Sequence, residues 1–294
     1  MAVYKRTYKT YEGALTPSWS RFSIVGRYSF ATLFKSRIFT AYTVLCFLPL
    51  LYGIGWVYLI HTPLAQQLMN VRMGSVLQVS NSWFAHILEV QAWMGFLLAT
   101  AAAPGLVSQD LANQALQLYL SRPLSRVEYL LGKISVLAVL LSAITWIPGL
   151  LLFGLQAQLQ GQGWGWDHFY LIGSMILSGW MWITVISLLM LAISVWVKWR
   201  IAATGLIVGV FFLLPRFSDA FDKILSTTWG RVFNLPYVLH RAWESIYRVD
   251  PDFRHITYEN RLPLWAAWAT ILTVCLISIW LLNRRLKARE VERG

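Results

Sequence analysis

Six long apolar runs with almost no charge constrain this chain more than any other feature of its sequence. They lie at about 38–60, 83–107, 134–155, 169–197, 201–215 and 262–283. A helix needs roughly 20 apolar residues to cross a ~30 Å hydrocarbon core, and most of the runs reach that length. Hydrophobic residues make up 57% of the chain and charged residues 13%, which is outside the range of soluble domains. We therefore predict an all-α polytopic membrane protein with six transmembrane helices.

The fifth run, 201–215, is short for a span, since it provides only about 22 Å of helix at ~1.5 Å per residue. If it did not cross, the C-terminus would emerge on the side opposite the N-terminus. The five Lys and Arg residues of the C-terminal tail would then lie outside, against the positive-inside rule. We therefore count it as a span and predict that both termini are cytoplasmic.

The charge balance agrees with this topology. The cytoplasmic segments hold 17 of the 25 Lys and Arg residues and 5 of the 13 Asp and Glu residues, so the whole net charge of +12 lies on one face. Membrane orientation accounts for such a distribution, and no nucleic-acid partner is needed to explain it. We predict a multi-pass protein of the plasma (inner) membrane, with the lipid bilayer as a partner.

Three segments flank the spans. Residues 1–37 are predicted to form a cytoplasmic tail and an amphipathic helix in the membrane interface, with Trp19, Phe22, Phe30 and Leu33 on one face. The alternative is a cytosolic helix packed on a partner. The segment 216–261 reads as an extracytoplasmic region with short amphipathic helices, and 284–294 as a basic cytoplasmic tail. Pro49 and Pro148 should kink the first and third spans.

A polar segment, 104–133, joins the second and third spans. Its pattern predicts a surface helix that begins at Asp110, where a carboxylate suits the positive end of the helix dipole. Pro123 stops this helix, since proline disfavours a helical conformation in the residue before it. Ser125 and Glu128 then have the spacing of a capping box, which starts the third span.

This segment resembles the coupling-helix region of ABC transporter permeases of the type-2, mostly exporting, class. Those subunits carry an acidic residue after the second span, a Leu-rich turn, a Ser-x-Pro-[Leu/Ile]-Ser-Arg run and a Gly-Lys pair before the third span. The residues of this chain that match are Asp110, Leu116 to Leu120, Ser121, Pro123, Leu124, Ser125, Arg126, Gly132 and Lys133.

The resemblance implies a permease subunit that moves its cargo by alternating access. A second permease subunit, identical or related, would complete the path, and separate ATPase subunits would bind the ATP and Mg. The residues expected to couple the permease to the ATPase are Asp110, Gln114, Tyr119, Ser121, Arg122, Pro123, Ser125, Arg126 and Lys133. Arg122 and Arg126 have an alternative role, in which they only satisfy the positive-inside rule and reach lipid phosphates.

Catalytic patterns are sparse in this sequence. It has no phosphate-binding loop and no His or Cys spacing typical of a metal site, so we predict neither enzyme activity nor a cofactor in this chain. Glu89, about two turns inside the second run, is a candidate gate or substrate contact because carboxylates are uncommon within membranes. The alternative is that it reaches interfacial water. A non-transporting scaffold or sensor, and a membrane enzyme, are the other two function classes.

Overall fold

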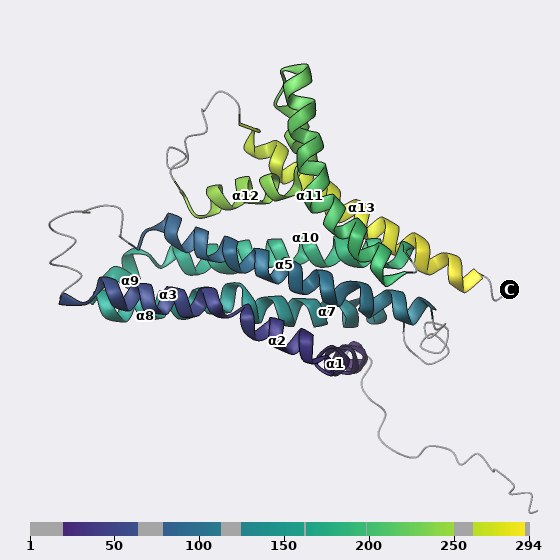
Figure 1. The fold of residues 1–294 in the computed structure, drawn as a ribbon, viewed down its shortest axis with the longest axis horizontal. Coiled ribbons are helices and arrows are strands. Elements are labelled where there is room, and N and C mark those ends of the chain that lie inside the picture. The colour runs from purple at the N-terminus through teal and green to yellow at the C-terminus, as the bar shows by residue number, and fades with distance from the viewer. Residues whose placement is uncertain are drawn as a thin grey trace, which may run out of the picture.

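The computed structural model describes residues 20–63, 79–112, 125–161, 163–197, 199–249 and 261–291, and in these ranges every regular element is a helix (Figure 1). Six stretches are long and apolar enough to cross a membrane: α2 with α3, α5, α7 with α8, α10, α11 and α13. The predicted all-α fold with six spans is therefore confirmed. The helices are α1 (Arg21–Leu33), α2 (Arg37–Leu45), α3 (Leu48–Ile60), α5 (Asn81–Ala112), α7 (Arg126–Ile144), α8 (Trp146–Gln160), α9 (Trp164–Asp167), α10 (Tyr170–Trp196), α11 (Arg200–Leu225), the 3₁₀ helix η2 (Trp229–Phe233), α12 (Leu235–Ile246) and α13 (Leu264–Val291).

Two of the spans are each divided into two helices near a proline. Pro49 lies in the first turn of α3, and Pro148 lies in the first turn of α8. Proline lacks an N–H group, and the first turn is the part of a helix where that group has no partner to lose. The spans are therefore interrupted beside both prolines, at 46–47 and at Thr145, whereas a kink without a break was predicted at Pro49.

Several helices continue past the ends predicted for them. α5 extends through Pro104 to Ala112, and α11 extends through Pro215 to Leu225. An internal proline removes one backbone hydrogen bond but does not have to end a helix inside a membrane bundle. α11 therefore has 26 residues and is long enough to span, although its apolar run is short. The predicted outer region thus begins within α11, and the predicted basic tail begins within α13.

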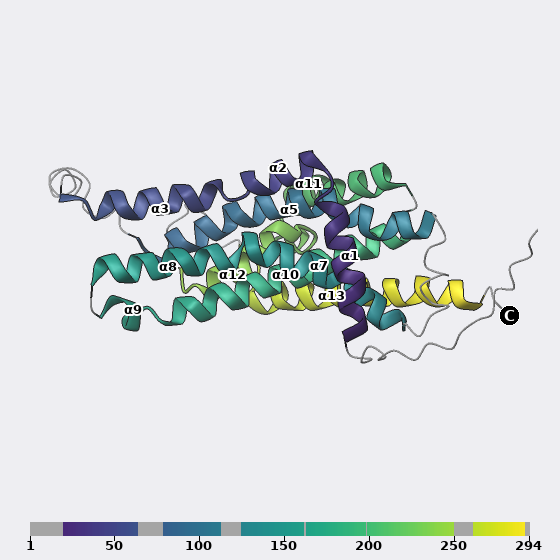
Figure 2. The same cartoon turned by 90° about the horizontal axis from the view of Figure 1, so that it is seen from below.

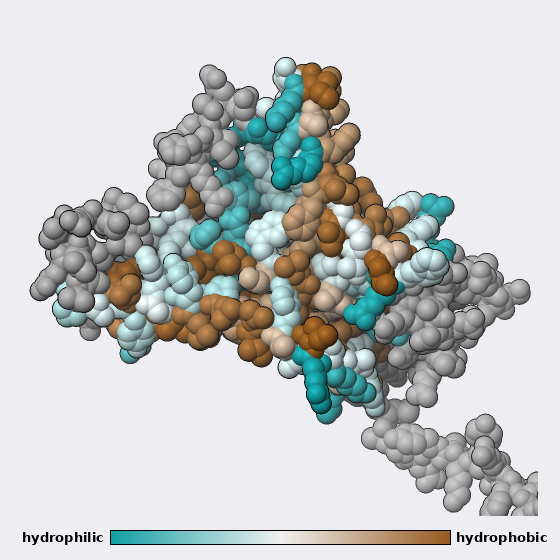
Figure 3. Space-filling view, in the orientation of Figure 1, coloured by the Kyte–Doolittle hydropathy of each residue, from teal (hydrophilic) through white to brown (hydrophobic). Residues whose placement is uncertain are grey.

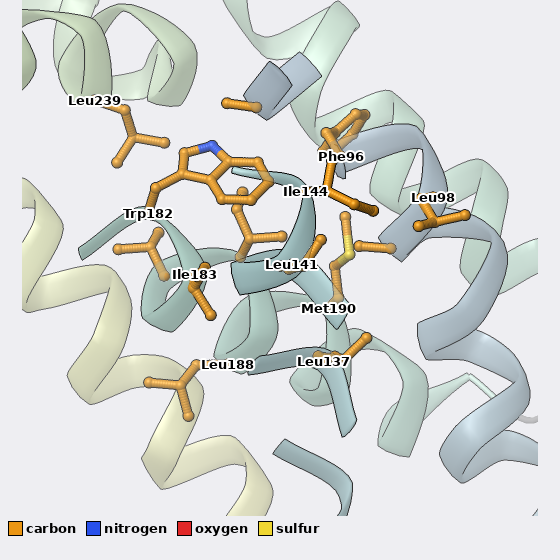
Figure 4. Close-up of a cluster of buried hydrophobic side chains, with 14 of the residues drawn as sticks. Phe96, Leu98, Leu137, Leu141, Ile144, Trp182, Ile183, Leu188, Met190 and Leu239 are labelled. Atoms are coloured by element: carbon orange, nitrogen blue, oxygen red, sulfur yellow. The ribbon is translucent and has the colours of Figure 1, made fainter. Parts of the chain in front are cut away.

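α10 lies at the centre of the bundle, in contact with α5, α7, α8, α11, α12 and α13. Its buried side chains meet those of α5 and α7 in the core that Figure 4 shows, where Trp182, Ile183 and Met190 lie near Leu137 and Leu141. Small residues allow close approach, as at Gly179, where an added Cβ atom would lie 2.8 Å from Trp146 Cβ. By contrast, only 22% of the residues in the apolar part of each of the spans α2 with α3, α11 and α13 are buried.

α1 crosses the bundle instead of following it. Figure 1 shows this helix end-on, and Figure 2 shows it lying across α7. The two helices meet at Gly26 and Gly132, where a Cβ atom added to Gly132 would come within 2.8 Å of the Phe22 carbonyl oxygen. Phe30 and Leu33, which were predicted to lie on the apolar face of this helix, pack against the core. An axis perpendicular to the spans is the orientation expected of a helix in the plane of the membrane surface.

α12 lies beside a span, not on a surface. The Trp243 Nε1 atom donates a hydrogen bond to the Ser178 carbonyl oxygen at 3.3 Å, and the Tyr247 and Ser178 hydroxyl oxygens are 3.2 Å apart. Ser178 is eight residues after the first residue of α10, which is about 12 Å along a helix at ~1.5 Å per residue. α12 buries one face, which includes Val238 and Ala242, so it is amphipathic as predicted for this region, but this face packs into the bundle.

Candidate functional site

Residues from three helices form a buried ionic cluster at the end of the bundle where α1 lies. The Lys133 Nζ atom is 2.8 Å from Asp110 Oδ2 and donates a hydrogen bond to Ser29 Oγ at 2.9 Å. The Tyr129 hydroxyl donates to the same Asp110 oxygen at 2.9 Å. We call these four residues the Lys133 cluster. Lys133 is only 3% exposed, and a buried ammonium group is tolerated when it is paired in this way.

Local sequence explains how the Lys133 cluster forms. Tyr129 and Lys133 are four residues apart, so they share one face of α7. The Ser125 hydroxyl accepts a hydrogen bond from the Glu128 backbone N–H at 3.2 Å, and the Glu128 carboxylate accepts one from the Ser125 N–H at 2.6 Å. This capping box sets where α7 begins, and it confirms the prediction from the sequence.

The position of Asp110 corrects one prediction. Asp110 does not begin a surface helix, because it lies in the last turn of α5. A carboxylate is unfavourable at that end of a helix dipole, and the nearby Lys133 ammonium group compensates for it. The second span was predicted to end at 107, before Asp110, whereas α5 continues to Ala112.

The structure thus describes only part of the predicted coupling region. Asp110 and Lys133 are brought together, and Ser125 caps α7 beside them. Arg126 is the first residue of α7, and its side chain is outside the described part of the structure. Gln114, Tyr119, Ser121, Arg122 and Pro123 also lie outside the described residues. Sequence reasoning missed Tyr129, which its spacing from Lys133 could have indicated, and Ser29, for which the sequence has no signal.

A pocket of about 440 Å³ lies among α5, α10, α11 and α12. Glu89 of α5 is on its wall, together with His240 and Glu244 of α12 and with Arg261, which precedes α13. We call it the Glu89 pocket. Its size is within the range of ligand-binding pockets, roughly 300–1,000 Å³. Glu89 is therefore positioned where a substrate contact or gate could act, and that role stays a prediction.

Charged side chains connect α5 to α12 at this pocket. The two ring nitrogens of His240 face two carboxylates, with Nδ1 3.5 Å from Glu89 Oε1 and Nε2 3.4 Å from Glu244 Oε1. The guanidinium groups of Arg241 and Arg261 lie 3.1 Å and 3.8 Å from Glu244 Oε2. Burial would raise the pKa of Glu244, but hydrogen bonds and charge from His240 and Arg241 outweigh it and lower that pKa.

The comparisons with known proteins identify no family. The chain matches no protein-family model, and no curated protein matches it in sequence. The functional assignment therefore depends on the membrane-helical fold, the Lys133 cluster and the Glu89 pocket.

Proposed function

We propose that the chain is the permease subunit of an ATP-binding-cassette exporter, which works with separate ATPase subunits and a second permease subunit. The observation that carries the proposal is the Lys133 cluster. It connects the end of α5 to the start of α7, and these two helices flank residues 113–124, the core of the predicted coupling segment. The proposed arrangement places both termini in the cytoplasm and the α1 end of the bundle at the cytoplasmic face.

The Lys133 cluster connects α5 and α7, the two helices on which a displaced coupling segment would act. Force applied between α5 and α7 would otherwise separate them, but the Asp110–Lys133 ion pair holds them together. The hydrogen bond from Lys133 to Ser29 adds α1 to the same unit. Movement of an ATPase would therefore shift three helices together.

α5 connects this unit to the Glu89 pocket. Glu89 and Asp110 are 21 residues apart on one helix, a distance of about 32 Å at ~1.5 Å per residue. A displacement at Asp110 is therefore transmitted along α5 to the pocket wall. In this mechanism, ATP-driven movement changes the access of cargo to the Glu89 pocket, while the chain itself binds no nucleotide.

Purification of the tagged chain from its own membranes tests the proposal. We expect an ATP-binding-cassette protein to co-purify and the preparation to hydrolyse ATP. The same preparation from cells in which that ATPase gene is deleted should contain the chain and no ATPase activity. Recovery of the chain without any nucleotide-binding protein, in a mild detergent that preserves its oligomer, would favour the scaffold or sensor alternative.

A further inference from the structure

Along the walls that α5 and α11 form, the lining of the Glu89 pocket changes from charged to aromatic. Along α5, Glu89 comes first, followed by Trp93 and Phe96 toward the α1 end. α11 runs the other way, and the pairs of rings define their register: Phe96 lies 4.1 Å from Phe211, and Trp93 lies 5.8 Å from Phe212, between ring centroids. Aromatic rings therefore line the part of the pocket nearer the middle of the bundle.

The charged part of this lining carries both signs. Beyond its aromatic residues, α11 contributes Arg216 and Asp219 to the pocket wall, and both side chains are exposed. They are three residues apart, which places them roughly 5–6 Å from each other on one helix face. Figure 3 shows hydrophilic residues along the side of the upper part of α11 that faces α12, with hydrophobic residues on the other side of that helix. Glu89 and His240 lie on the other walls.

This change along the lining specifies the chemistry of a ligand. An apolar chain fits among the rings, and its charged head has to lie toward Glu89 and Arg216. A purely anionic head would meet Asp219 and Glu89, and a purely cationic head would meet Arg216. A head that joins a phosphate to an amine or quaternary ammonium group can pair with Arg216 through one end and with Asp219 or Glu89 through the other.

We propose that the Glu89 pocket binds a zwitterionic amphiphile, with its phosphate-and-amine head at Arg216 and Asp219 and its hydrocarbon chain against Phe96 and Phe211. The role of this ligand as cargo rests on the proposed function. Binding itself is measurable without transport.

Photoaffinity labelling of the purified protein in maltoside micelles tests this orientation. Two lysophosphocholine probes are used, one with a diazirine next to the head and one with a diazirine at the end of the chain. The head probe should label peptides that contain 215–219 and 237–244. The chain-end probe should label peptides that contain 93–96 and 211–212. Excess unlabelled lysophosphocholine should abolish both signals.

Matched variants separate pocket binding from lipid that coats the surface. Ala92 lines the pocket and is 5% exposed, so Ala92→Trp should fill the aromatic part and abolish labelling. Leu97 of the same helix is 45% exposed and outside the pocket lining, so Leu97→Trp should leave labelling unchanged. The exposed pair can be neutralised without filling space, and Arg216→Gln with Asp219→Asn should weaken competition by unlabelled lysophosphocholine about tenfold.

The head class has its own measurement. Anionic lysophosphatidylglycerol and a cationic alkyltrimethylammonium should each compete about tenfold less well than lysophosphocholine. Equal competition by either one would overturn the zwitterionic assignment. Labelling that does not saturate, or that Ala92→Trp and the neutralised pair leave unchanged, would overturn the site. If no ATPase co-purifies with the chain and the labelling is still saturable, the missing partner refutes the proposed transporter, and this inference stands.

Discussion

Removal of the Lys133 ammonium group tests whether the Lys133 cluster holds α1, α5 and α7 together. Lys133→Met keeps an unbranched side chain of similar length and leaves the Asp110 carboxylate without its cation. Breaking a fully buried ion pair on one side costs roughly 3–5 kcal/mol. The Asp110 side chain is 19% exposed and can reach water, so we expect the lower free-energy cost of about 2–3 kcal/mol.

A double-mutant cycle measures the interaction energy between the Lys133 and Asp110 side chains separately from their individual contributions. Asp110→Asn alone leaves the buried Lys133 unpaired and should also destabilise the fold. The double variant removes both charges, so its loss should be smaller than the sum of the single losses by about 1–2 kcal/mol. The assay is equilibrium unfolding by sodium dodecyl sulfate in mixed micelles, followed by circular dichroism.

Arg27→Met is the matched control, because Arg27 is an exposed cation of α1 and its loss should change the unfolding free energy by less than about 0.5 kcal/mol. Additive losses in the cycle, within about 0.5 kcal/mol, would refute the reasoning. Lys133 would then contribute through packing alone.

Three further predictions concern packing, pH and topology. Gly132→Ala should destabilise the protein by about 1–3 kcal/mol, because the new Cβ atom would lie 2.8 Å from the Phe22 carbonyl oxygen, whereas Gly154→Ala has open space and should be neutral or stabilising. The pKa of Glu244 is lowered in the folded protein, so its stabilising effect is complete above the unfolded value of 4.5 and is lost as the pH falls through the folded value. Glu244→Gln should therefore be less stable than the wild type at neutral pH and closer to it in acid, and equal differences at both pH values would contradict the assignment. Cysteines introduced at positions 10 and 290 should react with a thiol reagent only from the cytoplasmic side, and one at 225 only from outside. Labelling of position 290 from outside would show that the fifth run does not cross the membrane.

The positions of the spans could be predicted from the sequence because charge is costly within a bilayer, so each span appears as a long run of apolar residues with almost no charge. The ends of the helices were less accessible to this reasoning. The second and fifth spans were predicted to end at 107 and 215, yet α5 and α11 continue to Ala112 and Leu225. Both helices pass through a proline, because neighbouring helices can satisfy the backbone carbonyl group that each proline frees. The lengths of those two helices therefore depend on tertiary packing.

The candidate sites show the same limit. Asp110, Lys133 and Glu89 could be selected because charged residues at the edge of a span are unusual. Their partners could not be selected, since Ser29 is 104 residues from Lys133 and His240 belongs to a helix that folds back beside α10. Only the fold brings these residues together, and no periodic pattern in the sequence marks them as neighbours.

Site-specific cross-linking between this chain and its partner tests the central claim most directly. With Cys46 and Cys275 replaced by alanine, Ser121→Cys places one thiol in the predicted coupling segment, and Gly165→Cys places one in α9, at the other end of the bundle. In whole membranes treated with a short thiol-to-amine cross-linker, position 121 should form a conjugate with an ATP-binding-cassette ATPase, and position 165 should not. Conjugation of the ATPase at position 165, or of no nucleotide-binding protein at position 121, would contradict the proposed permease.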